Sequence, residues 1–230
     1  MIARRKAGLA VVAASAVLAL TGCGSLQPGA AAVVDSARIS HDEVDRVAAA
    51  LCSANLGGAA AQGQPQPALA SSGARQGALQ VLLDSEISGL FGEQEGVEAN
   101  NQQLSQALAQ NEPGIALLPA DQREDFRAAL EDYASGQLML IEIGRGSLED
   151  QGQTNVTDDA ALAEGQRLRG QFVQSIDVEI DPRYGTFEGQ TLQAGGSALS
   201  VATSQRARAA NRAEPPGAYV ESLPASQRCS

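Results

Sequence analysis

A lipobox, Leu20-Thr21-Gly22-Cys23, decides which part of this chain of 230 residues folds. Basic residues at 4–6 and an uncharged apolar stretch over 7–20 precede it, in the order of a bacterial lipoprotein signal. The apolar stretch is shorter than the about 20 residues that a membrane-spanning helix needs. We therefore expect residues 1–22 to be a signal peptide and Cys23 to carry palmitate-type lipid. Such an anchor would place the protein on the extracytoplasmic side of the bacterial cell membrane.

Two cysteines remain once Cys23 is assigned to the lipid. Cys52 and Cys229 form an even pair, and in an oxidising compartment such a pair is interpreted first as a disulfide. A bridge would tie the end of the chain to an early helix and stabilise the fold by roughly 4–5 kcal/mol. The alternative is one buried thiol and one thiol in the tail, and the sequence leaves both open.

The charge of the chain disfavours several classes of function. The signal holds three of the 16 basic residues, so 13 remain against 27 acidic ones, a formal charge of −14. Nucleic-acid binding needs basic patches, and electrostatic attachment to an anionic membrane needs the same sign of charge. Lys6 is the only lysine and leaves with the signal, so we expect no P-loop nucleotide site.

His41 is the single histidine and the one candidate for acid–base catalysis. It follows Ser40 at the start of a predicted helix, and no serine or carboxylate pattern marks it as a base. We interpret it as an exposed residue of the helix cap. A lone histidine also excludes zinc motifs that use several histidines. We therefore expect no catalytic residue, no cofactor and no metal, in a protein that is not an enzyme.

Helical periodicity dominates the centre of the chain. Ser40 and Glu43 form a capping box, and apolar residues then recur at helical spacing. Glycine and proline mark the expected ends of the helices. The predicted helices cover about 41–55, 74–91, 100–110, 121–143 and 158–175, and their expected breakers are Gly57-Gly58, Gly92, Pro113-Gly114 and Gly144.

Strand signals flank this helical region. Residues 31–34 and 37–39 are β-prone and predict a hairpin around Asp35-Ser36. Residues 176–181 alternate apolar and acidic side chains, which predicts a strand. Its acidic row has two interpretations, a solvated face, which is the usual one, or oxygen ligands for a cation. This row consists of Asp177, Glu179 and Asp181.

The composition divides the chain into an anchor, one domain and a tail. We expect a flexible tether over 23–30, a mainly α-helical domain over 31–187 with a flexible loop at 57–73, and a low-complexity, largely disordered tail over 188–230. In this fold class a small β-sheet accompanies the helices.

Three stretches carry a resemblance to a known family. They look like an opening strand and helix start, the beginning of a later helix, and a closing strand and turn. They are Ala32-Val33-Val34-Asp35 through Ile39-Ser40 and Val44, residues 97–108, and Val178-Glu179-Ile180-Asp181-Pro182-Arg183-Tyr184-Gly185.

In order and spacing these stretches are similar to the N-terminal chaperone domain of the SurA family and its trigger-factor-like relatives, over residues 31–187. The resemblance implies that Val33-Val34 lies beside the strand Val178–Ile180. SurA-type foldases also carry a parvulin isomerase domain, which has no counterpart here, so prolyl isomerase activity is not implied.

Anchor and resemblance together imply an ATP-independent chaperone or folding-factor-like lipoprotein that binds unfolded secreted polypeptides. Apolar residues such as Met139 are candidates for the binding surface, although a stripe at helical spacing is more often core. The alternative is a non-catalytic envelope lipoprotein that docks one dedicated protein partner. An enzyme would rest on His41 alone.

Overall fold

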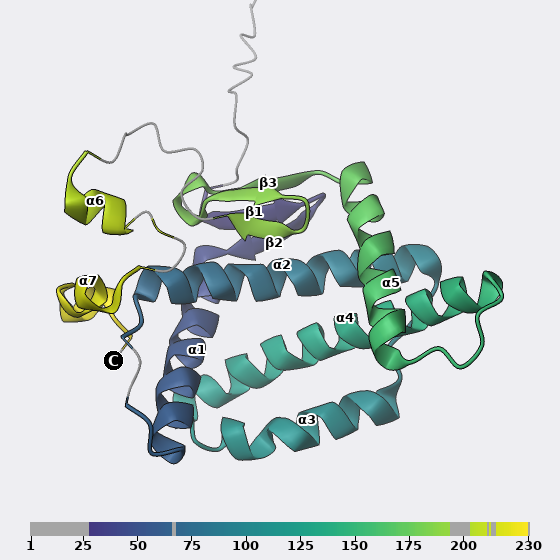
Figure 1. Ribbon diagram of the computed structural model, residues 1–230, viewed down its shortest axis with the longest axis horizontal. Coiled ribbons are helices and arrows are strands. Elements are labelled where there is room, and N and C mark those ends of the chain that lie inside the picture. The colour runs from purple at the N-terminus through teal and green to yellow at the C-terminus, as the bar shows by residue number, and fades with distance from the viewer. Residues whose placement is uncertain (1–27, 66–67, 194–202, 211, 213–214, 230) are drawn as a thin grey trace, which may run out of the picture.

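The computed structural model describes residues 28–65, 68–193, 203–210, 212 and 215–229. The fold is mainly α-helical with small antiparallel sheets, the class predicted from the sequence. Figure 1 shows the main sheet along one side of a long central helix and two further helices on its other side. The predicted signal peptide and Cys23 lie outside the described residues.

The main sheet has three strands in the order β2-β1-β3. Strands β1 (Ala30–Val34) and β2 (Ala37–Ser40) form the expected hairpin, and Asp35 takes the positive φ of 50° that its turn requires. Strand β3 (Val178–Ile180) pairs antiparallel with β1, with Val34 opposite Val178. The opening and closing strands are therefore neighbours, as the resemblance implied.

Side-chain caps begin three of the five long helices. The predicted capping box of Ser40 and Glu43 is confirmed, while Asn100 and Thr157 accept backbone N–H groups at two later helix starts. The long helices are α1 (His41–Ala61), α2 (Ser71–Glu95), α3 (Asn101–Ile115), α4 (Arg123–Asp150) and α5 (Asp158–Phe172). Short 3₁₀ helices, η1 (Ala120–Gln122), η2 (Val173–Ser175) and η3 (Pro182–Tyr184), adjoin these elements.

The predicted helix ends are wrong at most of the glycines and prolines. Helix α1 runs through Gly57-Gly58, α2 passes Gly92, and α3 contains Pro113. A glycine inside a helix costs about 1 kcal/mol, which tertiary packing overrides. The loop expected over 57–73 is shortened accordingly, because both of its ends are helical. Helix α2 ends instead at Gly96, whose φ of 68° is left-handed.

Gly144 lies inside α4 because it allows close contact with another helix. A Cβ atom on Gly144 would overlap the carbonyl oxygen of Ala161 in α5. A Cβ atom on Gly165 would overlap the carbonyl oxygen of Leu140 in α4. The two glycines thus bring the backbones of α4 and α5 into direct contact, and the expected break at Gly144 does not occur.

The tail is more ordered than its composition suggested. Residues 186–193 form a hairpin, and Val220 and Leu223 near the end of the chain are buried. Cys229 donates its backbone N–H to the carbonyl of Leu69 at 2.9 Å. These contacts correct the expectation of a largely disordered tail for the described part of residues 188–230. The tail elements are β4 (Thr186–Glu188), β5 (Thr191–Gln193), α6 (Gln205–Ala210), α7 (Gly217–Glu221) and η4 (Ala225–Gln227).

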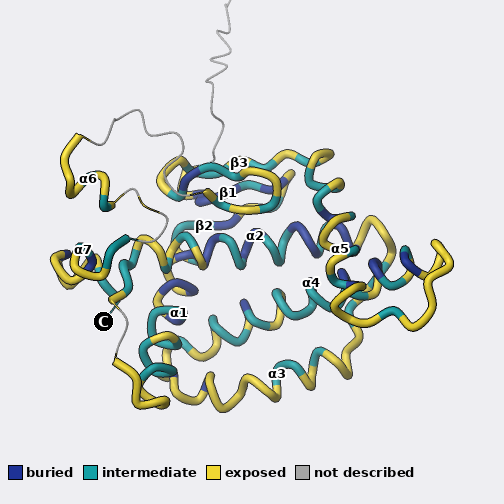
Figure 2. Tube along the Cα trace, in the orientation of Figure 1, coloured by how far each residue is buried: buried dark blue, intermediate teal, exposed yellow. Residues whose placement is uncertain are grey.

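The main core lies between the sheet, α1 and α2 (Figure 2). Val34, Val44, Leu79 and Leu83 are fully buried there. A smaller cluster around Leu140 joins α2 and α4 to α5. Among the helices of the described residues, none combines the length and the hydropathy that a membrane crossing requires.

Candidate functional site

Cys52 in α1 and Cys229 form a disulfide, with their Cα atoms 5.3 Å apart. The interpretation of these cysteines as a pair is therefore confirmed. The bridge joins residues 177 positions apart and holds the end of the tail against α1 and the start of α2. Cys23, the predicted lipidation site, lies outside the described residues.

His41 is not the exposed cap residue that its position suggested. Its side chain is 21 % exposed, its Nδ1 lies 3.0 Å from the Tyr184 hydroxyl, and its Nε2 lies 2.6 Å from the Arg183 guanidinium. Asp181 binds the same guanidinium, which holds the pKa of that carboxyl below its usual range. Burial raises the pKa of Tyr184. The cluster fastens the turn after β3 to the start of α1.

The acidic row of the closing strand does not gather around one point. Asp181 is engaged by Arg183 and lies 3.3 Å from His41, while the backbone N–H of Asp177 donates to Asp35 in the hairpin turn. In the described part of the chain, no group of histidine, cysteine, aspartate and glutamate is arranged to hold a metal ion. Asp177 and Glu179 are exposed, as on a solvated face, whereas Asp181 is partly buried in its ion pair.

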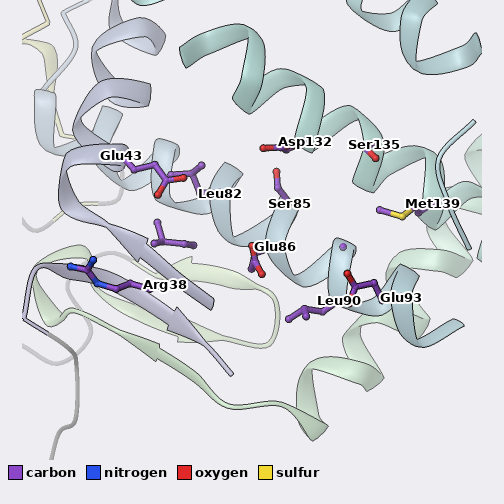
Figure 3. A pocket seen from close by; sticks show the side chains of 12 residues that line it. Arg38, Glu43, Leu82, Ser85, Glu86, Leu90, Glu93, Asp132, Ser135 and Met139 are labelled. Atoms are coloured by element: carbon purple, nitrogen blue, oxygen red, sulfur yellow. The ribbon is translucent and has the colours of Figure 1, made fainter. Parts of the chain in front are cut away.

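A groove of about 340 Å³ opens between β2, α2 and α4 (Figure 3). Its apolar lining comes from Ile39 of β2, Leu82 and Leu90 of α2, and Met139 of α4. Met139, which the sequence could not separate from the core, is half-buried in this lining.

Small residues leave the space for the groove. Helices α2 and α4 touch at Gly136, where a Cβ atom would lie 2.9 Å from the Cβ of Ser88. Beside this contact the groove is lined by Ser85, Gly89 and Ser135. A Cβ atom on Gly89 would meet nothing within 4 Å. The helices are thus in contact on one side and separated by an open space on the other.

Four carboxylates line the groove, on Glu43, Glu86, Glu93 and Asp132. Burial raises the pKa of Glu86, and the negative charges of the other three add to this shift. The pKa of Asp132 is raised by the loss of water around its carboxylate and by the adjacent Glu131. The arrangement therefore concentrates like charges that repel one another.

No positive charge compensates these acids. Within the part of the chain that the structure describes, no ion pair or hydrogen bond engages the carboxylates of Glu86, Glu93 and Asp132. Arg38 is the single cation in the lining, and its Nη2 donates to the carbonyl of Pro28 at 3.0 Å. A groove that combines a few apolar side chains with carboxylates that form no ion pair suits a ligand that carries both apolar and positively charged groups.

Sequence reasoning missed the groove because its acids come from three helices far apart in the chain. The one available signal was Glu86, which interrupts the apolar stripe of α2 between the buried residues Leu83 and Ile87. In the sequence, Glu43 is recognisable only as a capping residue and not as a residue of the groove. Comparisons with protein-family models, with curated proteins and with solved structures find no match to this chain.

Proposed function

We propose that the protein is a lipid-anchored extracytoplasmic holder of unfolded secreted polypeptides, which acts without ATP and without catalysis. The groove between β2, α2 and α4 carries this proposal, because a few apolar side chains line it beside four carboxylates, which suits a polypeptide segment with apolar and basic residues. The helical domain with paired opening and closing strands is compatible with the SurA-type resemblance.

The size of the groove supports weak and reversible binding. Burying one apolar side chain contributes about 1.5–3 kcal/mol, and a groove of this volume covers only a few side chains. The cost of association offsets much of this gain. Binding of this strength releases a polypeptide spontaneously, so no nucleotide is required for a cycle of capture and release.

The predicted anchor would keep the groove near the membrane. Pro28 bonds to Arg38 in the groove lining and follows Cys23 by five residues. Five residues span at most about 18 Å when fully extended. A lipid on Cys23 would thus hold the groove close to polypeptides that emerge at the membrane surface.

Aggregation of a model protein tests the proposal. The soluble form that begins at residue 23, with Cys23→Ser, is mixed with a protein that unfolds on heating, and light scattering is followed without reductant so that Cys52–Cys229 stays closed. We expect suppression at a near-stoichiometric ratio. Absence of suppression would overturn the holder function and would favour docking of one dedicated partner.

A variant with a filled groove links the activity to the site. Gly89→Leu places a side chain in the open space and should abolish suppression, whereas Gly77→Leu on the same helix, also without neighbours within 4 Å of its Cβ, should not. Circular dichroism confirms that both variants are folded. Separately, metabolic labelling with palmitate and membrane fractionation of wild type and Cys23→Ser test the anchor.

A further inference from the structure

The groove meets strand β2 at its free edge. Arg38 and Ile39 both line it, although successive side chains of a strand point to opposite faces of the sheet. A groove lined by both must therefore pass along the edge of the strand. The other edge of β2 is paired with β1.

The register shows which backbone groups face the groove. The carbonyl of Ala31 accepts from Asp181, and the N–H of Asp35 donates to Asp177, so the odd-numbered residues of β1 bond toward β3. Val33, which is opposite Arg38, follows the same alternation. Arg38 therefore directs its backbone N–H and C=O away from β1, at the free edge.

An extended polypeptide satisfies these groups by adding a strand to the sheet. Unpaired donors and acceptors at a sheet edge are a template for such pairing. An added strand would place one row of its side chains on Leu82 and Leu90 and bring its other groups within reach of the carboxylates of Glu86 and Asp132.

We propose that the groove binds an extended polypeptide segment that carries lysine or arginine beside apolar residues, and that this segment pairs with the free edge of β2. This inference rests on the proposed function and names the class of polypeptide that is held. Charge complementarity selects the segment, the apolar side chains of the lining contact it, and the backbone N–H and C=O of Arg38 pair with it.

Peptide binding tests the class of ligand. Fluorescence anisotropy compares a labelled nonapeptide of alternating leucine and lysine with the same peptide carrying glutamate instead of lysine. We expect the lysine peptide to bind at least about tenfold more tightly at low salt, and this preference to shrink in high salt. Equal affinities for the two peptides would overturn the proposal.

Charge variants test whether the preference for the lysine peptide arises in the groove. Glu86→Gln with Asp132→Asn should weaken binding of the lysine peptide about fivefold. The matched double variant Glu142→Gln with Glu149→Gln, on exposed positions of α4, should leave it unchanged. Equal losses in the two double variants would show attraction by overall charge alone and would overturn the assignment to the groove.

A proline tests strand pairing. Arg38→Pro removes the outward backbone N–H, and a sheet edge tolerates proline. Arg38→Ala removes the same side chain and keeps the N–H. We expect the proline variant to bind about fivefold more weakly than the alanine variant, from the loss of one hydrogen bond. Equal binding by two folded variants would overturn the added strand.

The outcomes separate this inference from the proposed function. Suppression of aggregation that persists in Gly89→Leu, with no preference for the lysine peptide, would contradict the inference and leave the holder function standing on another surface. Binding of the lysine peptide without any suppression would contradict the holder function and leave the peptide site standing.

Discussion

Two carboxylates of helix α2, those of Asp84 and Glu86, lie in opposite settings. Asp84 lies 3.1 Å from the guanidinium of Arg169, which also donates to Ser88 and Gln190. Glu86 lies near three further carboxylates, and no ion pair engages it among the described residues. Burial raises the pKa of both acids, but only Asp84 has an attractive partner that counteracts the shift.

The comparison distinguishes the charge of Asp84, which is paired within the fold, from the charge of Glu86, which forms no ion pair there. The polar network of Arg169 is closed, since it joins α5, α2 and the β4–β5 hairpin through groups that are all partnered. Glu86, Glu93 and Asp132 in the groove form no ion pair among the described residues, and the charges of Glu93 and Asp132 raise the pKa of Glu86. A cationic partner, as proposed above, would supply an interaction that the fold omits.

Breaking the closed network should have the largest effect. Arg169 is 7 % exposed, and its loss would leave the mostly buried Asp84 without its cation, with only a hydrogen bond to Gln80. We expect Arg169→Met to lower the free energy of unfolding by about 4 kcal/mol in chemical denaturation. Arg167→Met removes the more exposed guanidinium that pairs with Glu164 in the same helix and should cost much less. Similar losses in the two variants would contradict the distinction.

Moving α5 away from α4 should disturb the side of α2 on which Arg169 binds Asp84. Gly144→Ala forces the two backbones apart and should lower the free energy of unfolding by about 3 kcal/mol. Gly146→Ala, two residues further along α4, meets nothing within 4 Å and should be neutral or slightly stabilising. Thermal and chemical denaturation measure both variants, and a neutral Gly144→Ala would refute the backbone contact.

Removing charge from the groove should stabilise the protein. The pKa of Glu86 is raised above 4.5, so its ionised form lowers stability as the pH rises through and above that value. Glu86→Gln should raise the free energy of unfolding by up to about 1 kcal/mol at neutral pH, an effect limited by solvent screening, and should have no effect below about pH 4.

An acid with the opposite shift provides the control. Arg167 lowers the pKa of Glu164 to about 2, so ionised Glu164 adds stability above pH 4.5 that is lost as the pH falls through about 2. Glu164→Gln should therefore destabilise at neutral pH. Denaturation curves measured across this pH range would contradict the comparison if the two substitutions acted in the same direction.

Filling one empty position of the groove should have the smallest effect. Gly89→Ala replaces a helical glycine whose Cβ has free space, and it should raise the free energy of unfolding by about 0.5 kcal/mol. Gly136→Ala, at the contact of α2 with α4, should lower it because its Cβ would lie 2.9 Å from Ser88. Thermal unfolding distinguishes the two, and shifts of the same sign would be inconsistent with an open groove.

The parts of the fold that could be predicted from the sequence are those specified by residues close together in the chain. The capping box at Ser40 and the hairpin around Asp35 depend on residues within a few positions of one another. The helix ends predicted at glycines were wrong because a helical pattern does not distinguish a glycine that ends a helix from one that contacts another helix. Gly144 meets Ala161, and nothing in the sequence around either residue indicates this meeting.

The candidate site was beyond sequence reasoning for the same reason. Glu43, Glu86 and Asp132 come from three helices, and only the tertiary fold brings them to one groove. His41 likewise meets Tyr184, which is 143 residues away. The two cysteines were identified because in an oxidising compartment an even number alone suggests a pair.

The disulfide also governs how the protein responds to mechanical load. Residues 53–228 lie inside the covalent loop that Cys52 and Cys229 close. A pull applied between Cys23 and Ser230 would therefore bypass most of the helices and act on the disulfide itself. Only the β1–β2 hairpin and the first half of α1 lie in the path of the force. A protein tethered at Cys23 would yield there first, while the groove helices α2 and α4 stay free of tension.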